Sequence, residues 1–240
     1  MQLIVRRLPL TPQACAIQLA TKLNWWYSAD NLTVLNGLVA GATDLSGNNR
    51  NGIQSTIVDR LSYFSSDAMF GGRPSFGSTT ITASRHLAAP SSFTYWHQIF
   101  SAYYKDGIDT TFDVFSVFSA GTKPYGSPRL LGEQNRANII SSSVYALSIS
   151  RGGDVASATV LPLPATVLSA SGNATFSLQI GGSTVTSNRV LVGAFRHFVG
   201  ASQVLTTQEI QLIEGVIAWD DGTQNTLIPS HPYRNQPPFV

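Results

Sequence analysis

Short runs of Val, Ile, Phe, Tyr, Thr and Ser, bounded by Gly, Asn, Asp and Pro, make up most of this sequence. Such runs are typical of β-strands, and close spacing between them is typical of antiparallel connections. Turn sequences such as SGNNRNG, KDGID and SRGGD separate them. The runs that predict strands lie at 23–29, 52–56, 75–80, 94–105, 111–119, 137–150, 165–171, 174–182 and 189–201. The pattern predicts an all-β domain, either a sandwich or a barrel.

One segment has helical periodicity instead, at about 206–220. Thr206 and Glu209 have the spacing of a capping box, and Gly222 provides a stop signal. The apolar stripe of this segment consists of Ile210, Leu212, Ile213, Val216 and Ile217. We expect this short helix to cover an open end or edge of the β core.

The low charge content limits the classes of partner. The chain has 240 residues, of which 12% are charged, about half of the usual share, and its net charge is +2. So small a positive charge does not favour nucleic-acid binding, and no apolar run approaches the length of a membrane span. A surface with few charges is instead expected to be partly covered by partner proteins. The single Cys15 excludes an internal disulfide and is expected to be buried.

The first 20 residues differ from the rest of the chain. RRLPLTPQ at 6–13 contains two prolines and no strand alternation, which predicts an extended arm over 1–20 before a domain at 21–240. The arm is expected to dock on a neighbouring subunit or particle through its apolar and basic residues. These anchoring candidates are Leu3, Val5, Arg6, Arg7 and Leu8. Because the arginines follow a short apolar stretch, residues 1–13 lack the order of a secretory signal, and we expect a chain that is made and kept in a reducing cytoplasm, or assembled there.

Several motifs, in their order along the chain, resemble a known family. They are LNWWYSADNLTV, VAGATDLSGNNRNG, GGRPSFGSTT with LAAP, LTTQEIQLIEGVIAWDDG and LIPSHPY. This set resembles the laminin-G-like, concanavalin A-like lectin domains that are common in bacteriophage structural proteins and bacterial surface proteins, over roughly residues 21–235. The matching residues are Ala29, Asp30, Asp44 to Asn48, Pro229, His231, Pro232 and Tyr233.

The resemblance implies a jelly-roll sandwich of two antiparallel sheets with one short C-terminal capping helix. It also implies that the His231–Tyr233 segment holds the C-terminus against the first strand. The chain departs from the family at Asp220 and Asp221, where relatives have bulky or basic residues. That departure puts in doubt any partner that binds this end of the helix in relatives.

Catalytic pairs are hard to find in the sequence. Glycoside hydrolases, which also exist on this fold, need two carboxylates at a fixed separation. The glutamates of this chain are Glu133, Glu209 and Glu214, and the last two belong to the predicted helix. No nucleophile elbow, phosphate-binding loop or Cys-x-x-Cys pair occurs. We therefore expect that the chain is not an enzyme.

Metal sites receive little support from the sequence. His86 and His97 lie eleven residues apart on different predicted elements, which does not favour zinc. Calcium is a possible ligand of the DLSGNNRNG loop through Asp44, Asn48 and Asn49, but Arg50 follows and the spacing is not that of a calcium loop. We expect no cofactor, and for Asp44 we favour the role of an Asx-turn residue.

Aromatic residues offer a candidate contact site. Tyr95, His97 and Tyr103 share one face of a predicted central strand, and Tyr125 lies in the loop sequence KPYGSPR. Aromatic rings beside polar groups can bind a glycan, but rings with this pattern more often pack in the core or at a subunit contact.

The resemblance, the low charge and the N-terminal segment together predict a non-enzymatic virion structural protein of a bacteriophage. It would be a capsid decoration, head fibre or tail-associated adhesion module, assembled in the host cytoplasm and bound to other virion proteins and to sister subunits, with a trimer preferred. A host-surface glycan is a further possible ligand. The alternative is a carbohydrate-binding module of a bacterial cell-surface or secreted protein.

Overall fold

The computed structural model describes residues 8–79, 85–88, 93–94, 97–104, 115–119, 145–150, 175–181, 193–203, 205–227 and 229–239. Its strands are β1 (Leu23–Ser28), β2 (Leu32–Leu35), β3 (Leu38–Ala42), β4 (Gly52–Ile53), β5 (Ser62–Asp67), β6 (Arg73–Ser78), β7 (Leu87–Ala88), β8 (Phe93–Thr94), β9 (His97–Tyr104), β10 (Phe115–Ser119), β11 (Tyr145–Ser150), β12 (Thr175–Ile180) and β13 (Gly193–Ala201). Its helices are α1 (Pro12–Gln18) and α2 (Thr207–Asp221), with 3-10 turns η1 (Ala29–Asn31), η2 (Ile57–Asp59), η3 (Ala68–Phe70) and η4 (Gln224–Thr226).

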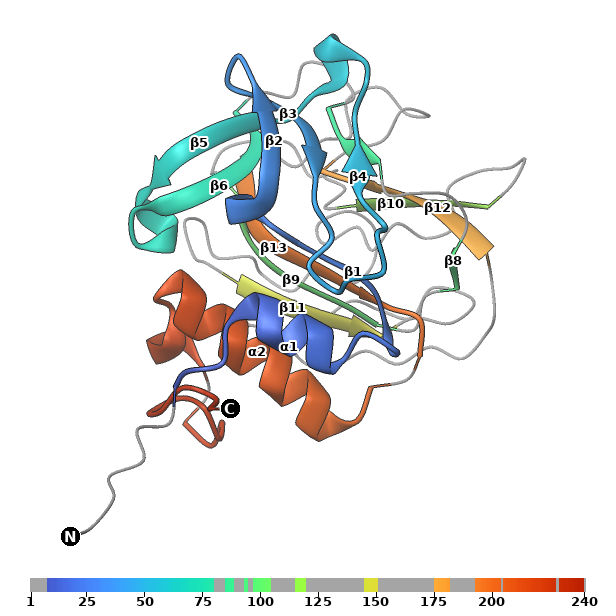
Figure 1. Cartoon of the computed structure of the whole chain (residues 1–240). Helices are drawn as coiled ribbons and strands as arrows, with labels where there is room; N and C mark the ends of the chain where they lie inside the picture. Colours follow the sequence, from blue (N-terminus) through green and yellow to red (C-terminus); the bar gives the residue numbers. More distant parts are fainter. Residues whose placement is uncertain are drawn as a thin grey trace, which may run out of the picture.

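The described strands pair antiparallel and follow one continuous hydrogen-bonded path. Its order is β10-β12-β7-β4-β3-β5-β6-β13-β9-β11, and β1, β2 and β8 attach at its sides. The predicted all-β class is therefore confirmed, as one curled sheet (Figure 1). The finer prediction of two stacked jelly-roll sheets stays a prediction, since the pairing links all described strands.

Strand β13 is the centre of the architecture. One of its edges pairs with β9 over its whole length, and the other is shared between β6 at Gly193–Phe195 and β1 at 197–201. The register with β9 shifts between Phe195 and His197, so Arg196 occupies a bulge. A bulge bends its strand and redirects side chains. It lies where β13 changes from one neighbour to the other.

Strands β2 and β3 form a hairpin that lies outside the strands predicted from the sequence. Its turn is Asn36-Gly37, with φ values of 53° and 76°. Two consecutive positive φ values are what a two-residue hairpin turn of matching twist requires, and Asn-Gly is the sequence that adopts them most readily. Strand β5, at SYFSSD, was also absent from the predicted strands.

Helix α2 matches its prediction closely. Thr206 and Glu209 form both hydrogen bonds of the capping box, and Gly222 ends the helix in the left-handed conformation with φ of 72°. The stripe residues Ile210, Ile213 and Ile217 are buried. They pack in one apolar cluster with residues of α1, β1 and β13, and α1 and α2 lie side by side on one side of these strands (Figure 1). The helix thus closes the core on that side.

The predicted extended segment over residues 1–20 differs from the structure at residues 12–18, which form α1. Thr11 accepts a hydrogen bond from the backbone N–H of Ala14, and Pro12 occupies the first turn, where its missing N–H costs nothing. Cys15 is buried as expected, and burial raises the pKa of its thiol to about 12. Residues 1–7 lie outside the described residues, and the division into arm and domain stays a prediction.

The two ends of the described chain meet. The backbone N–H of Leu10 donates to the carbonyl of Pro238 at 2.7 Å, and Pro9 and Phe239 form an antiparallel bridge. The expectation that His231–Tyr233 would hold the tail against the first strand is wrong, because the contacts of this segment are with α2. The indole N–H of Trp219 donates to the carbonyl of Tyr233 at 2.7 Å.

Within the described residues, no helix has the length and apolar character needed to cross a membrane.

Candidate functional site

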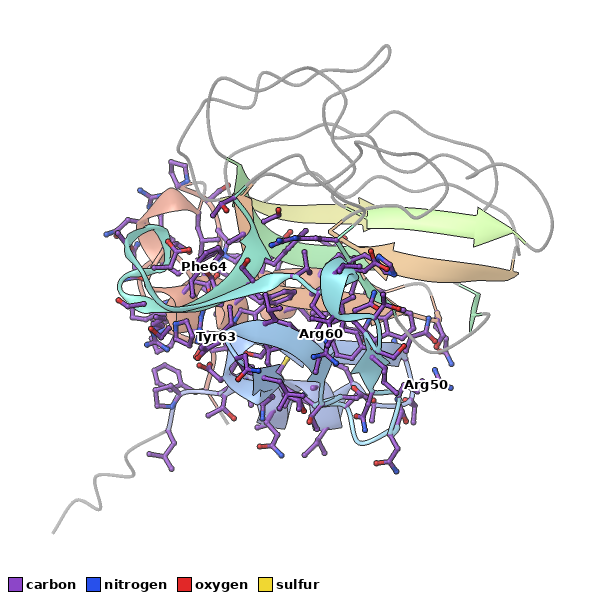
Figure 2. The ribbon with its side chains drawn as sticks, turned by 90° about the horizontal axis from the view of Figure 1, so that it is seen from above. Arg50, Arg60, Tyr63 and Phe64 are labelled. Carbon is purple, nitrogen blue, oxygen red and sulfur yellow. The ribbon has the colours of Figure 1, made fainter. Side chains whose placement is uncertain are left out.

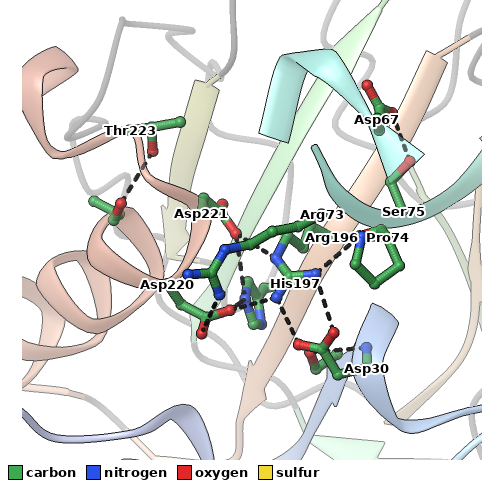
Figure 3. Close-up of polar contacts among 12 residues, drawn as sticks. Asp30, Asp67, Arg73, Pro74, Ser75, Arg196, His197, Asp220, Asp221 and Thr223 are labelled. Carbon is green, nitrogen blue, oxygen red and sulfur yellow. Dashed lines mark hydrogen bonds and ion pairs between the residues drawn. The ribbon is translucent and has the colours of Figure 1, made fainter. Parts of the chain in front are cut away.

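Charged side chains from opposite ends of the sequence gather where β13 meets the C-terminal end of α2 (Figure 3). We call this group the Arg196 cluster; it consists of Asp30, Arg73, Arg196, His197, Asp220 and Asp221. Consecutive residues of a regular strand point to opposite faces. At the bulge of β13, however, both Arg196 and His197 reach the aspartates of α2.

The guanidinium of Arg196 binds three carboxylates. Its Nη2 lies 2.7 Å from Asp220 Oδ2 and 2.5 Å from Asp30 Oδ2, and its Nε lies 3.0 Å from Asp221 Oδ1. Its Nη1 also donates to the carbonyl of Pro74 at 2.9 Å. Only 1% of the Arg196 side chain is exposed. The planar, forked shape of arginine makes this multiple contact possible, which lysine could not reproduce.

His197 contacts the same two aspartates from the neighbouring position. Its Nε2 lies 2.9 Å from Asp220 Oδ2 and 3.3 Å from Asp221 Oδ1. On the other side of the ring, Nδ1 accepts a hydrogen bond from the indole N–H of Trp26. The imidazole is therefore held at both nitrogens, in a buried position.

The charges of the Arg196 cluster shift its pKa values in opposite directions. Burial disfavours the charged forms of Arg196 and His197, but the adjacent aspartates outweigh it and raise the pKa of both residues. Burial likewise acts to raise the pKa of Asp220, but His197 and Arg196 outweigh it and hold that pKa below its usual range. The acidic and basic groups thus stabilise each other's charged forms.

The position of the aspartates explains why α2 needs these cations. The C-terminal end of a helix carries partial negative charge, so Asp220 and Asp221 are unfavourable there. Helix α2 has no basic residue in its last turn. Arg196 and His197 from β13 and the half-exposed Arg73 from β6 provide the missing positive charge. The Arg196 cluster therefore ties the end of α2 to the sheet.

This finding accounts for the departure at Asp220 and Asp221. Their presence put in doubt a partner at the helix end. In the structure, the partners of both residues are basic residues of the same chain. Adjacent aspartates gave a sequence signal, but nothing near them in the sequence indicated that Arg196 and His197 would be their partners.

Three residues of the Arg196 cluster could in principle hold a metal ion. One ligand atom each of His197, Asp220 and Asp221 lies within 4.8 Å of the others. A divalent cation there would have to displace the Arg196 guanidinium from both carboxylates and would meet its charge at close range. The donor set fits an ion-pair network better than a metal centre.

The DLSGNNRNG loop is organised by Asp44. Its carboxylate oxygens accept hydrogen bonds from the backbone N–H groups of Trp26, Ser46 and Arg50 and from the hydroxyl of Ser46, at 2.8–3.2 Å. The bond from the N–H two residues on is that of an Asx turn, so this predicted role is confirmed. The Asn48 side-chain amide donates to the carbonyls of Ala20 and Leu23.

Asn49 has a positive φ of 57°, and Arg50, labelled in Figure 2, closes the same loop. The hydroxyl of Tyr27 donates to the carbonyl of Arg50 at 2.6 Å, and the Arg50 guanidinium donates to Asn24. The loop is thus bonded to β1 from several sides.

Phe64, toward the opposite end of the described β-structure in Figure 2, packs with Phe70 and Ala194.

Most of the predicted contact residues, or their side chains, lie outside the described part of the chain. His97 and Tyr103 lie in β9, which pairs with β13 and β11 and is therefore an interior strand, next to the end of the path. Their side chains are outside the described part. Tyr95, Tyr125 and Glu133 lie outside the described residues, as do the arm residues Leu3, Val5, Arg6 and Arg7. Leu8 is described, and its exposed fraction is 71%. The glycan-contact and anchoring roles stay predictions.

The glutamates and the histidine that were considered for catalysis or metal binding, and that the structure describes, have partners within the fold. Glu209 bonds Lys22 at 2.6 Å in addition to its capping box, and this outweighs burial and lowers its pKa. His86 is buried beside Gln54, with 2.9 Å between the His86 Nε2 and Gln54 Nε2 atoms. Glu214 is buried and pairs with His231.

No family model and no curated protein matches this chain. Among solved structures, the chain is similar to the Trypanosoma rangeli sialidase in complex with sialic acid. The sequence identity is 10% and the TM-score is 0.49, over 83% of this chain and 33% of the sialidase chain. The chain thus spans about a third of that protein's length.

The comparison corrects one prediction. The exclusion of enzymatic activity is corrected: a solved structure to which this chain is similar is that of a sialidase, which is an enzyme. We withdraw that exclusion. At this identity and TM-score the likeness assigns no activity to the chain.

Proposed function

We propose that this chain is a structural protein of a bacteriophage particle. In this proposal a concanavalin A-like jelly roll of the laminin-G-like kind is displayed on a capsid, head fibre or tail, and residues 1–8 anchor it. Support comes first from the motifs that resemble the family. Asp44 forms the Asx turn and α2 forms the capped helix that these motifs predict.

The observation that carries the proposal is that the backbone at Leu10 is bonded to the C-terminal segment. Leu10 is hydrogen-bonded to Pro238, so the segment that carries Leu8 is fixed beside the C-terminal residues. Leu8 is already exposed there. An anchor that leaves one end of a domain holds the opposite end away from the particle, which suits a display module.

Partners of matching chemistry are other virion proteins and sister subunits. Apolar side chains are exposed on and near β4 and η2, at Ile53, Ile57 and Val58. With only 12% charged residues, such a surface favours a protein neighbour over solvent. A trimer on a symmetric particle, assembled in the host cytoplasm, is the preferred state.

A co-purification experiment tests the proposal. The tagged chain is expressed in host cells that are producing phage, particles are banded on a density gradient, and the chain is quantified in the particle band. We expect the full chain in that band in a fixed ratio to capsid protein. A variant that lacks residues 2–7 should fold, because its Leu10–Pro238 bond is retained, yet remain at the top of the gradient. A full chain that also remains there contradicts the proposal.

The second candidate is a carbohydrate-binding module of a bacterial surface or secreted protein. Its support is the aromatic set Tyr95, His97, Tyr103 and Tyr125, of which His97 and Tyr103 belong to the central strand β9. Glycan-array binding by the purified monomer, lost in the Tyr95→Ala and Tyr103→Ala double variant, would favour this function. Binding that survives the double variant would remove this site.

A further inference from the structure

Residues 229–239, which we call the C-terminal strap, are attached to α2 at a few defined contacts. The Trp219 indole donates to the Tyr233 carbonyl at 2.7 Å. Gly215 faces the Tyr233 ring so closely that a Cβ there would lie 2.6 Å from the ring. The strap ends by pairing Pro238 and Phe239 with Leu10 and Pro9. It therefore holds both ends of the described chain against one helix.

One titratable pair lies inside this contact. His231 of the strap and Glu214 of α2 are both buried, and His231 Nε2 lies 3.5 Å from Glu214 Oε2. The other oxygen, Oε1, has no hydrogen-bond partner among the described residues. Burial, the largest influence on Glu214, raises the pKa of that carboxyl, although His231 acts against it.

The backbone of the strap fixes the proton on the imidazole. The N–H of Tyr233 donates to His231 Nδ1 at 3.2 Å, so Nδ1 accepts and a neutral ring carries its hydrogen on Nε2, toward Glu214. A second proton would have to enter at Nδ1, where it would meet the N–H of Tyr233. Protonation of His231 therefore removes a hydrogen bond within the strap, beside its contact with Glu214.

Charge neutrality sets the pH range in which the pair can stay buried. With a protonated Glu214 and a neutral His231, the pair has no net charge and the Tyr233 N–H still has its acceptor. Loss of a proton leaves a buried anion, and gain of a proton leaves a buried cation. A buried charge without a counter-charge is far more costly than a neutral pair, so both changes favour exposure of the pair to water.

Among the described side chains of the elements packed on α2, none supplies a compensating charge to the pair; strands β9 and β11 also contact α2, and their side chains, His97 included, are outside the described part. Helix α1, which packs on α2, has Cys15 as its titratable residue, and α2 itself carries Glu209 in its capping box and two aspartates in the Arg196 cluster. The strap contains the phenol of Tyr233, whose ring centroid is 5.9 Å from that of His231, and Arg234. Among the ionisable groups described, His231 is the one that acts on Glu214.

We propose that the C-terminal strap is a pH-responsive latch, which keeps both chain ends on α2 while the Glu214–His231 pair is neutral and releases them when the pair gains or loses a proton. Release at residues 238–239 also removes the partner of Leu10, so the N-terminal segment is freed with the strap. The device acts on the chain ends whatever partner they bind.

Trp219 provides the measurement. Its indole ¹⁵N–¹H resonance reports the bond to Tyr233 and is assigned by its absence in Trp219→Phe. In a titration from about pH 4 to about pH 10, we expect the bonded signal to be constant in the middle of the range and to be lost toward both ends. On each side, the ratio of released to docked strap should rise about tenfold per pH unit. Far-UV circular dichroism should stay constant, because α2 remains folded.

Matched variants decide the cause. Glu214→Gln should abolish the loss on the alkaline flank, since the amide does not ionise, and His231→Gln should abolish it on the acidic flank. Glu209→Gln, another change on α2, should leave both flanks unchanged. If either buried variant fails to fold, a joint Glu214→Leu and His231→Leu replacement should keep the strap docked throughout. A wild-type signal that does not change with pH, or an alkaline loss that persists in Glu214→Gln, overturns the proposal.

Discussion

The indole N–H of Trp26 donates a hydrogen bond to Nδ1 of His197 at 3.2 Å, and both side chains are buried. The two rings meet edge to face, with 6.1 Å between centroids. Because Nδ1 accepts, neutral His197 carries its hydrogen on Nε2, which lies 2.9 Å from Asp220. A strand residue of β1 thus decides how a β13 residue presents its proton to α2.

This relationship predicts a tautomer that can be measured. In ¹⁵N spectra of the imidazole at high pH, His197 should show the Nε2–H form. Replacing Trp26 with Phe should remove the preference, because the donor to Nδ1 is lost. A wild-type His197 in the Nδ1–H form would contradict the assigned hydrogen bond.

The Arg196 cluster predicts how stability depends on pH. Asp220 and Asp221 raise the pKa of His197 despite its burial, so its contribution is fully present below about pH 6.5, the unfolded value, and is lost as pH rises through the folded pKa. For Asp220, whose pKa is lowered, the contribution is present above about pH 4 and is lost as pH falls through the folded value. Urea unfolding across this range should show both losses. His197→Gln should remove the alkaline one, and a wild-type-like alkaline slope in that variant would refute the assignment.

Replacement of Arg196 tests whether the cluster holds α2 to the sheet. Arg196→Met should reduce the free energy of unfolding by about 3–5 kcal/mol, because it leaves Asp221 buried without its main counter-charge. Arg73→Met is the matched control. That side chain is half-exposed and contacts the same Asp220, so the expected loss is about 1 kcal/mol or less. Equal losses in the two variants would argue against a buried network.

The isoleucine stripe of α2 gives a packing prediction. Ile213→Ala should cost about 2–5 kcal/mol, since the residue is fully buried between α1 and the sheet and its removal leaves a cavity. Ile57→Ala, at a position that is 64% exposed, should change stability by about 0.5 kcal/mol or less. Chemical denaturation measures both, and a small effect at Ile213 would mean that α2 does not close the core.

The close approach of Gly215 and Tyr233 predicts that the effect of Gly215→Ala on stability changes sign when the Tyr233 ring is removed. Alanine normally stabilises a helix interior by about 1 kcal/mol relative to glycine. In the wild-type background Gly215→Ala should instead destabilise the protein, because the new Cβ would lie 2.6 Å from the Tyr233 ring. In the Tyr233→Ala background the same change should stabilise. A double-mutant cycle measured by thermal unfolding separates the two terms.

Local signals predicted the elements that depend on local chemistry. The capping box at Thr206, the stop at Gly222 and the Asx turn at Asp44 are confirmed because each is formed within a few residues. The Asn36-Gly37 turn carried an equally local hairpin signal, which the strand analysis did not use. Helix α1 was missed for the opposite reason. Pro9 and Pro12 favour an extended chain in the sequence pattern, whereas a proline in the first turn is compatible with a helix that tertiary packing stabilises.

Local sequence patterns do not predict the contacts of the Arg196 cluster or of the C-terminal strap. Asp30 and Arg196 are 166 residues apart, and Trp26 and His197 are 171 apart. Nothing in the neighbourhood of either partner indicates the other. The bulge at Arg196 compounds the difficulty, since regular alternation would have placed Arg196 and His197 on opposite faces.

By itself, the sequence determined the antiparallel β class, the capped α2 helix with its buried isoleucines, and the turn at Asp44. These follow from side-chain periodicity and from hydrogen bonds between near neighbours. Only the tertiary structure decided which charges meet, where the tail lies, and that α1 joins the core. Those contacts depend on strand pairing and burial between distant segments, and the free energy of a buried charge or ring is set by neighbours that chain order does not specify.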